Sequence, residues 1–367
     1  MSIPLKLVAA NDTVGATIAL ADALAGSQAV FITPPEVNGL MPEVHGLPNE
    51  VPDHIALIVE SSGSTGTPKQ IWLSRNALLA SSAASDAALG GPGQWLLALP
   101  ANYIAGANVL LRSLAANTQP VLMNTALPFT PEAFALSASF MTGERRYVSL
   151  VPTQLNRLVS AAAIDDFLLA KLRRFNAILV GGQALDQGLR TRAEELGLNL
   201  VRSYGSAETA GGVVYNGLPL AGVQVRTNGH GALEISSPTL AEGLDPWYTT
   251  SDLGEIAPDG SVKVLGRTNR VLNSGGLKAS LDAVEAVVLK IGGVVEAAAI
   301  AVNHPTWGER AAVVYVGSPE VADYVAADVF DALGAAAKPI RVVRVDAIPR
   351  LANGKTDYLS LQETFAE

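Results

Sequence analysis

The chain has 367 residues, no cysteine and a formal net charge of −9 at pH 7. This composition excludes disulfides, thiolate metal sites and a cysteine nucleophile, and it argues against a nucleic-acid-binding surface. The length favours a large domain plus a smaller one. No apolar run reaches the roughly 18 residues that span a bilayer, and the N-terminus does not have the pattern of a secretory leader. We therefore expect a cytoplasmic protein without membrane insertion.

The first feature in chain order is a polar loop between two apolar segments. The apolar run IALIVE, residues 55–60, precedes SSGSTGTPK at 61–69, and QIWLS at 70–74 is expected to form a strand. One interpretation of the loop is a flexible surface turn, because Gly, Ser, Thr and Pro favour turns. The other is a phosphate cradle of backbone N–H groups and hydroxyls, with Lys69 adding charge. Pro68 precedes Lys69 and a strand follows, so the loop is not a Walker A loop.

From residue 94 to 204, short apolar runs alternate with helical segments. The alternation predicts a parallel sheet with helices on both faces. One helix has a clear start signal, with Thr130 as the cap and Pro131 at the first helical position. Ligands gather at the carboxyl ends of such strands, which is where VGGQ and SYGSAET lie. The apolar runs are 95–100, 120–123, 147–151, 177–182 and 200–204, and the helices are expected at 106–117, 130–141, 153–163 and 187–197.

The pattern changes after Gly211. Short strands and Gly/Asn/Pro turns predict an antiparallel, β-rich subdomain up to about residue 267. A small α+β unit follows, with a helix at 280–293 that Ser280 caps and that has Asp282 and Glu285 in its first turn. Strands are expected at 296–303, 311–317 and 340–349, with a helix before the last. The predicted fold is therefore α/β, with one domain at 1–267 and a second at 268–367.

Taken together, these segments resemble the acyl-adenylate-forming enzymes, the superfamily of acyl-CoA synthetases, luciferases and peptide-synthetase adenylation domains. Besides the loop at 61–69, the similar motifs are LPANYIAG, VPTQL, LVGGQAL, SYGSAET, YTTSDLGEI, LGRTNRVLNSGGLKASLDAVE, HPTWGERAAVVYV and PRLANGKTDYLSL. They follow in the family's order and cover about residues 56 to 361. The resemblance implies ATP-dependent activation of a carboxylic acid, in which the carboxylate attacks the α-phosphorus and pyrophosphate leaves. Preorganised donors and Mg²⁺ would stabilise the charge on the phosphoryl oxygens.

The resemblance also implies which residues bind the nucleotide. Glu208 would help to hold Mg²⁺, and Ala207 stands where the family usually has a threonine that is often aimed at the α-phosphate. Ser206 or Thr209 could supply that hydroxyl instead, and Ser251 stands where glycine is usual. The implied ATP-binding residues are Ser62, Gly63, Ser64, Thr65, Gly66, Thr67 and Lys69 at the β/γ-phosphates, Gly181, Gly182 and Gln183 at the adenine, the segment Ser203, Tyr204, Gly205 and Ser206, and Asp252 and Arg267 at the ribose.

The C-terminal motifs imply a second half-reaction. With no cysteine in the chain, an external thiol must attack the acyl-adenylate, and the resemblance indicates coenzyme A. It also implies that the C-terminal domain is mobile and rotates about Asn269, where aspartate is usual. Lys355 would act in adenylation, although a solvated lysine beside an Asn-Gly turn is the plainer reading. After the rotation a CoA-side loop would enter, containing Gly275, Gly276 and Lys278.

The acyl substrate follows from the short N-terminal segment. Only residues 1–60 precede the polar loop, and together with SLVPTQLNRLV this resembles the o-succinylbenzoate–CoA ligases of menaquinone biosynthesis. That acid has a second carboxylate and needs a cation, for which Arg157 is the candidate. The alternative is a solvated arginine on the exposed side of a helix. Tyr103, Gly211 and Gly212 would complete the acyl site, with Tyr103 at its gate.

Three alternatives remain open from the sequence. The acid could be another aryl or short acyl acid, and the acceptor could be the phosphopantetheine of a carrier protein. The departures at residues 207, 251 and 269 also allow a catalytically inactive nucleotide-binding protein. The presence of Glu208, Asp252, Arg267 and Lys355 together argues against that last alternative. The sequence leaves the oligomeric state open, with a homodimer as one option.

Overall fold

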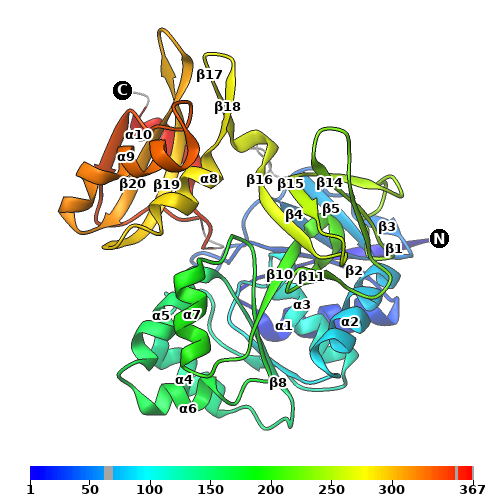
Figure 1. Cartoon of the computed structure of the whole chain (residues 1–367). Coiled ribbons are helices and arrows are strands. Elements are labelled where there is room, and N and C mark those ends of the chain that lie inside the picture. The colour runs from blue at the N-terminus through cyan, green and yellow to red at the C-terminus, as the bar shows by residue number, and fades with distance from the viewer. Residues whose placement is uncertain (62–68, 352–353, 366–367) are drawn as a thin grey trace. The chain divides into compact units, whose positions relative to one another are not determined.

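The computed structural model describes residues 1–61, 69–351 and 354–365. Contacts within the chain divide it into two compact units (Figure 1). The first unit comprises Met1–Val225 and Ile235–Tyr248, and the second comprises Arg226–Glu234 and Thr249–Glu367. In this division, residues 249–267 belong to the same unit as the C-terminal residues. A domain boundary after residue 267 remains a prediction.

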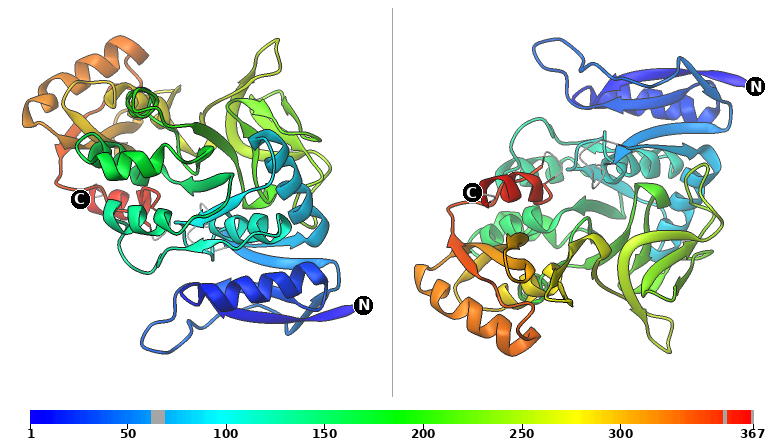
Figure 2. Two further views of the ribbon diagram at one scale, coloured as in Figure 1. Left: turned by 90° about the horizontal axis from the view of Figure 1, so that it is seen from below. Right: turned by 90° about the horizontal axis from the view of Figure 1, so that it is seen from above.

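The first unit begins with a five-stranded mixed sheet in the order β3-β1-β2-β4-β5. Strands β1, β2 and β4 are parallel, and β3 and β5 add to the two edges in the antiparallel sense. Helix α1 (Thr13–Ala25) lies beside β1, as both views of Figure 2 show. The strand expected at 70–74 is confirmed as β5. The strands are β1 Ser2–Ala9, β2 Ala29–Thr33, β3 Glu50–Pro52, β4 Ile55–Ser61 and β5 Lys69–Ser74.

A seven-stranded sheet follows in the order β12-β11-β10-β9-β8-β6-β7. Its five strands from β6 to β10 are parallel, which confirms the prediction for residues 94–204. The chain then turns back, and β11 and β12 extend the same sheet in the antiparallel sense. The strands are β6 Gln94–Leu97, β7 Val121–Leu122, β8 Arg146–Leu150, β9 Ala177–Val180, β10 Leu200–Ser206, β11 Gly211–Tyr215 and β12 Leu218–Pro219.

Helices cover both faces of this sheet (Figure 1). Successive strand residues point to opposite faces, so Trp95 and Leu97 join the core beside α2 and α3, whereas Leu96 joins the core beside α4 to α7. The cap predicted at Thr130 is confirmed, because its side chain accepts a hydrogen bond from the Ala133 N–H. Among the described helices, none is long and apolar enough to cross a membrane. The helices are α2 Arg75–Leu89, α3 Ile104–Ala115, α4 Pro131–Ser139, α5 Pro152–Ala162, α6 Asp166–Leu172 and α7 Gln187–Glu195.

The second unit holds most of a four-stranded sheet and a small α+β fold. The four strands are ordered β13-β14-β15-β16, and the α+β fold has a second sheet in which β21 lies parallel to β20. The elements of this region are β13 Gln224–Thr227, β14 Ala232–Ser236, β15 Tyr248–Ile256, β16 Val262–Arg267, η2 Thr268–Arg270, β17 Val271–Ser274, β18 Leu277–Ser280, α8 Leu281–Val288, β19 Val294–His304, β20 Gly308–Gly317, η3 Pro319–Val321, α9 Ala322–Leu333, β21 Arg341–Arg344 and α10 Tyr358–Phe365.

Helix α8 departs from its prediction in two respects. Ser280 caps it as expected, accepting a hydrogen bond from Ala283 N–H at 3.2 Å. The helix ends at Val288 and does not reach Gly293; the consecutive glycines at 292 and 293 disfavour a helix, and Gly293 has a φ of +94°. The first turn contains Asp282 but not Glu285. Glu285 lies further along the helix, where its carboxylate contacts other side chains instead of the helix terminus.

Candidate active site

Backbone segments approach each other closely at the end of β10. A Cβ atom on Gly205 would lie 2.0 Å from the Gly211 carbonyl oxygen, and one on Gly212 would lie 2.3 Å from the Ser203 Oγ. A Cβ atom on Gly181 would lie 2.9 Å from the Ser203 carbonyl oxygen. Only glycine allows such approaches. The structure therefore brings five of the predicted site residues together at the carboxyl ends of β9 and β10.

The turn after β10 carries Glu208, in the short helix η1 (Ala207–Thr209). The Thr209 hydroxyl accepts a hydrogen bond from the Ser206 N–H at 2.9 Å. It lies 2.7 Å from the Gly211 carbonyl oxygen and can donate a hydrogen bond to it. Thr209 is fully buried and already engaged in this turn. The Ser206 Oγ, in contrast, is buried and has no hydrogen-bond partner among the described residues. Of the two hydroxyls that could replace the one absent at Ala207, Ser206 is therefore the better candidate.

Two buried side chains fix the residue that ends this turn. Ala210 has a left-handed φ of 49°, which is uncommon for a residue other than glycine. Its carbonyl oxygen accepts hydrogen bonds from Asn108 Nδ2 and Ser81 Oγ, each at 2.9 Å. Sequence reasoning missed both residues. The available signal was Asn108 itself, a polar residue within the apolar helical run at 106–117.

Glu208 is suited to contribute to a metal site. Its carboxylate has no partner among the described residues, while its backbone carbonyl is held by Ala241 N–H at 2.8 Å. Within the described ranges, no group of three or more His, Cys, Asp or Glu side chains could hold a metal ion. Mg²⁺ commonly takes only one or two carboxylates and completes its shell with phosphate oxygens and water. A single glutamate therefore fits a Mg²⁺ ion shared with a nucleotide.

The phosphate-loop prediction falls mostly outside the described residues. Ser62, Gly63, Ser64, Thr65, Gly66 and Thr67 are not described, whereas Lys69 is exposed at the start of β5 and pairs in register with Ser61 of β4. Strand β4 also contacts η1, which carries Glu208. Strand β4, which leads into the predicted phosphate loop, and the Glu208 turn are therefore neighbours.

Tyr103 lies at the start of α3, half-buried. Burial raises the pKa of its phenol, and the nearby carboxylate of Glu60 on β4 adds to this effect. Tyr103 is therefore a neutral side chain near the end of β4. An aromatic gate at this place remains a prediction.

Arg157 is on the exposed side of α5, whereas Leu155, Leu158 and Val159 are buried as expected. Its Nη1 donates to the Phe129 carbonyl at 3.0 Å. Phe129 is not one of the predicted site residues, and the role of Arg157 in acid binding remains a prediction.

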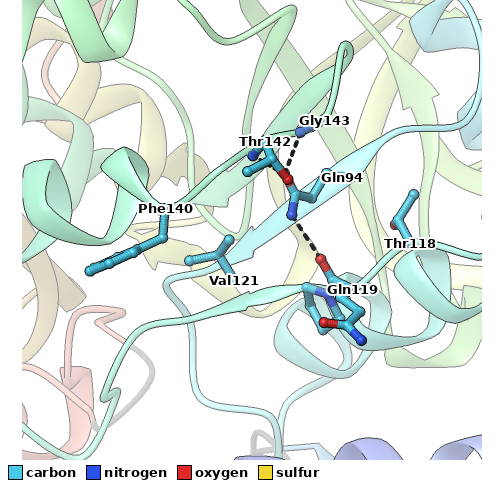
Figure 3. A pocket seen from close by; sticks show the side chains of 8 residues that line it. Gln94, Thr118, Gln119, Val121, Phe140, Thr142 and Gly143 are labelled. Atoms are coloured by element: carbon cyan, nitrogen blue, oxygen red, sulfur yellow. Dashed lines mark hydrogen bonds between the residues drawn. The ribbon is translucent and has the colours of Figure 1, made fainter.

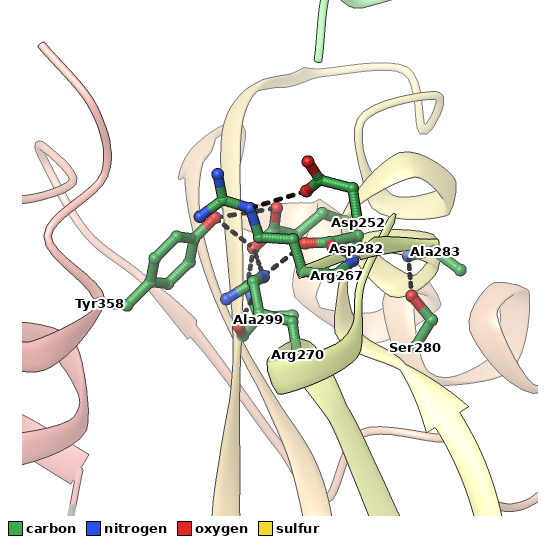
Figure 4. Close-up of polar contacts among 9 residues, drawn as sticks. Asp252, Arg267, Arg270, Ser280, Asp282, Ala283, Ala299 and Tyr358 are labelled. Carbon is green, nitrogen blue, oxygen red and sulfur yellow. Dashed lines mark hydrogen bonds and ion pairs between the residues drawn. The ribbon is translucent and has the colours of Figure 1, made fainter. Parts of the chain in front are cut away.

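The two residues predicted at the ribose form a pair in the second unit. Asp252 on β15 and Arg267 on β16 are cross-strand partners, and Arg267 Nε lies 3.2 Å from Asp252 Oδ1 (Figure 4). The aspartate side chain is 18% exposed and the arginine side chain 54% exposed. Because the guanidinium is only partly covered, it keeps donors that can face a ligand.

The predicted CoA-side loop is the turn of a β-hairpin. Gly275 and Gly276 connect β17 to β18 with φ values of 59° and 85°. Two consecutive positive φ values are typical of the two-residue hairpin turns that favour Gly-Gly. Lys278 is exposed and pairs with Asn273 across the hairpin. Asn269, the predicted hinge, is exposed in η2.

Lys355 is half-buried in a turn that ends just before α10. Its carbonyl accepts a hydrogen bond from Leu351 N–H at 2.8 Å. The next residue, Thr356, accepts from Arg350 Nη1 at 2.9 Å, and Arg350 Nη2 in turn lies 2.6 Å from Glu296 Oε2. Lys355 is therefore held through its own carbonyl and followed by a residue whose side chain is hydrogen-bonded.

A groove of about 460 Å³ lies elsewhere in the first unit (Figure 3). Gln94, in its lining, is the first residue of β6, so the groove is at the opposite end of the strand from the predicted site. The Gln94 side chain donates to Gln119 O at 3.0 Å and accepts from the Thr142 and Gly143 N–H groups at 2.8 Å. These bonds satisfy the amide within the protein, and we assign no ligand to the groove.

A buried polar cluster in the second unit surrounds Glu285, and Figure 4 shows Arg270, Asp282 and Tyr358 of this cluster. The Glu285 Oε1 accepts hydrogen bonds from Arg270 Nη2 at 2.6 Å, Ala299 N–H at 2.7 Å and Tyr358 OH at 3.0 Å. Arg270 also pairs with Asp282 and lies over the Tyr358 ring, 3.8 Å from its centroid. Burial raises the pKa of Glu285 to about 7, although Arg270 and the Ala299 N–H both favour the carboxylate.

This raised pKa predicts a pH dependence of stability. The folded protein binds the Glu285 proton more tightly than the unfolded chain, whose ordinary value is 4.5. The contribution to stability is therefore fully present below that value and is lost as the pH rises through about 7. Glu285→Gln cannot titrate, so its free energy of unfolding should fall less between about pH 5 and about pH 8 than that of the wild type. Urea unfolding of both proteins, with the exposed Glu320→Gln as control, measures this; equal pH slopes would contradict it.

Comparisons with known proteins show the family to which the chain belongs. The AMP-binding enzyme family matches residues 6–275, and the AMP-binding enzyme C-terminal domain matches residues 283–355. The chain therefore belongs to the AMP-binding enzyme family. It is 34% identical over 365 residues to a probable 2-succinylbenzoate–CoA ligase of Mycobacterium tuberculosis, covering 95% of this chain and 94% of that one.

Two further proteins are more distant. A 4-chlorobenzoate–CoA ligase of an Arthrobacter species is 26% identical, over 85% of this chain and 66% of its own. The structure of the o-succinylbenzoate CoA synthetase MenE from Bacillus subtilis, in complex with the acyl-adenylate intermediate, superposes with a TM-score of 0.72 at 22% identity, covering 94% of this chain and 80% of that one. This likeness confirms the predicted fold class, a large α/β domain followed by a small C-terminal domain.

Proposed function

We propose that this AMP-forming acid–thiol ligase converts 2-succinylbenzoate to its coenzyme A thioester, a step of menaquinone biosynthesis. The observation that carries the proposal is the relationship to the probable 2-succinylbenzoate–CoA ligase, which extends over nearly the whole length of both chains. That relative has nearly the same length as this chain, since 365 aligned residues cover 94% of it.

The reaction has two half-reactions. In the first, a carboxylate oxygen of the acid forms a bond to the α-phosphorus of ATP, and the bond to pyrophosphate breaks. In the second, the thiol sulfur of coenzyme A attacks the acyl carbon, AMP leaves with the bond electrons, and the thiol proton is released. Mg²⁺ would neutralise phosphate charge in the first step.

The residues of the site fit these steps. In the first unit, the backbone at Gly181 would face the adenine, the buried Ser206 hydroxyl would donate to the α-phosphate, and Glu208 would hold Mg²⁺. In the second unit, Asp252 and Arg267 would bind the ribose. We further propose that the protein acts in the cytoplasm, where ATP and coenzyme A are used; a homodimer remains a prediction.

Pyrophosphate release with ATP, Mg²⁺ and a panel of carboxylic acids tests this proposal. We expect 2-succinylbenzoate to give the highest kcat/KM, above benzoate and 4-chlorobenzoate. Release with only another aryl acid would keep the ligase and replace the substrate. Adenylate formation without CoA thioester would indicate a carrier protein as acceptor. No release with any acid would favour the inactive nucleotide-binding protein.

Arg157→Ala tests the acyl site separately. If Arg157 binds the second carboxylate, its loss removes a charge-assisted hydrogen bond worth about 1.5–3 kcal/mol, which is about ten- to a hundredfold in the KM for the acid. The KM for ATP should not change. Arg173→Ala is a matched control, because Arg173 is also exposed and also donates to a backbone carbonyl, that of Leu196. A wild-type KM for 2-succinylbenzoate in Arg157→Ala would refute this assignment.

A further inference from the structure

The cluster around Glu285 connects three separate segments of the second unit. Arg270 comes from η2, Glu285 from α8 and Tyr358 from the first position of α10. The Tyr358 hydroxyl lies 3.0 and 3.1 Å from the two oxygens of the Glu285 carboxylate. The side chains of Arg270 and Glu285 are only 12% and 16% exposed. A polar group from the start of α10 is thus tied to a charged pair inside the unit.

This tie lies close to the predicted catalytic lysine. Tyr358 follows Lys355 by three residues, and the Asp357 between them donates its N–H to the Pro349 carbonyl at 2.9 Å. Asp357 also accepts from the Ser360 N–H at 3.1 Å in the first turn of α10. Only two residues separate Tyr358 from Lys355, so the hydrogen bonds of Tyr358 restrain the chain next to the turn that carries Lys355.

The same cluster also fixes the start of the C-terminal part. Arg270 directly follows Asn269, the predicted hinge residue, and its guanidinium pairs with Asp282 and Glu285 of α8. Asp282 also accepts a hydrogen bond from the backbone N–H of Arg267 at 2.8 Å. Helix α8 thereby holds both the residue after the predicted hinge and, through Glu285, the start of the segment after Lys355.

A cluster that only stabilised the fold would not need charged side chains with several hydrogen bonds. Burying a charged pair costs desolvation energy, and well-packed apolar residues often stabilise a fold equally well. What a charged, multiply hydrogen-bonded cluster provides is a defined geometry. The hydroxyl of Tyr358 contributes to that geometry, while its ring alone could pack against Arg270.

We propose that Glu285 and Tyr358 are positioning residues, which hold the Lys355 segment in the geometry needed for adenylation by bonding it to the residue that follows the hinge. The inference rests on the proposed function, since it assigns Lys355 to the first half-reaction. Neither residue needs to touch substrate.

Tyr358→Phe is the sharpest test, because it removes the hydroxyl and keeps the ring over Arg270. We expect kcat for acid-dependent pyrophosphate release to fall about tenfold, since a misplacement of about 1 Å can cost up to about 10²-fold. The KM for ATP should stay at its wild-type value. Thioester formation from preformed acyl-adenylate and coenzyme A should also be unchanged. Glu285→Gln should give the same split, and Tyr324→Phe, which alters a tyrosine 59% exposed on α9, should have no effect.

Two results would overturn the inference. If Tyr358→Phe is folded and releases pyrophosphate at the rate of Tyr324→Phe, the hydroxyl does not position Lys355. If both half-reactions fall equally together with the melting temperature, the cluster only stabilises the fold. Both results require an active wild type and leave the proposed function intact. A wild type that releases no pyrophosphate with any acid refutes the proposed function, and this inference with it.

Discussion

Lys355→Ala should lower the rate of acyl-adenylate formation by at least about 10²-fold, the usual scale for losing one positioned electrostatic group. The ammonium group would bridge the substrate carboxylate and the α-phosphate, where negative charge gathers as the new bond forms. The same variant, supplied with preformed acyl-adenylate and coenzyme A, should make thioester at nearly the wild-type rate. Pyrophosphate release and single-turnover thioester formation measure the two steps separately.

A matched lysine provides the control. Lys290→Ala removes an exposed lysine that follows α8 in the same unit, and it should affect neither half-reaction. If the C-terminal domain rotates about Asn269 as predicted, the β17–β18 turn should act in the thioester step. A bulky residue at Gly276 should therefore slow thioester formation and spare adenylation. Equal slowing of both steps in Lys355→Ala would contradict the alternating use of the C-terminal domain.

We expect Gly205→Ala to cause a second large loss of adenylation activity. It would change the shape of the site, whereas Lys355→Ala removes a charge. The new Cβ atom would lie 2.0 Å from the Gly211 carbonyl oxygen and 2.8 Å from the Gly212 Cα. Both neighbours are backbone atoms, so one of the two strands must move. Overpacking of this kind costs about 1–3 kcal/mol, and the displaced turn carries Glu208. We expect a lower free energy of unfolding and an adenylation rate reduced by about 10²-fold or more.

Gly229→Ala is the matched control for this change. A Cβ atom at Gly229 would meet nothing within 4 Å, so we expect wild-type stability and wild-type adenylation. Urea unfolding and pyrophosphate release on the two variants compare the sites directly. If Gly205→Ala matched Gly229→Ala in both measurements, the close approach of β10 and β11 would have no role in the site.

The fold was most predictable where local rules and tertiary packing agree. The central strands β6, β8 and β9 are almost entirely buried, so each is a largely apolar run that the sequence shows plainly. The caps at Thr130 and Ser280 follow from side-chain chemistry alone. The joining of β11 to the seven-stranded sheet was not predictable, because it depends on a left-handed Ala210 held by side chains distant in the sequence.

The candidate site was likewise predictable only in part. Motif order placed Gly181, Ser203 and Gly205 in one site, and the structure brings them together. Glu285 was misinterpreted, because its spacing from Ser280 suggested an interaction with the helix terminus, whereas its carboxylate bonds to Arg270 and Tyr358. Those partners lie 15 and 73 residues away along the chain. No local pattern reports contacts of that range.

The most direct test of the account is the product balance with 2-succinylbenzoate as the acid. The purified protein would be incubated with ATP, Mg²⁺, coenzyme A and 2-succinylbenzoate, and the nucleotides and thioesters would be quantified by mass spectrometry. We expect one AMP for each 2-succinylbenzoyl-CoA, with neither product formed when the acid is omitted. Formation of ADP in place of AMP, or AMP release that does not depend on the acid, would contradict it.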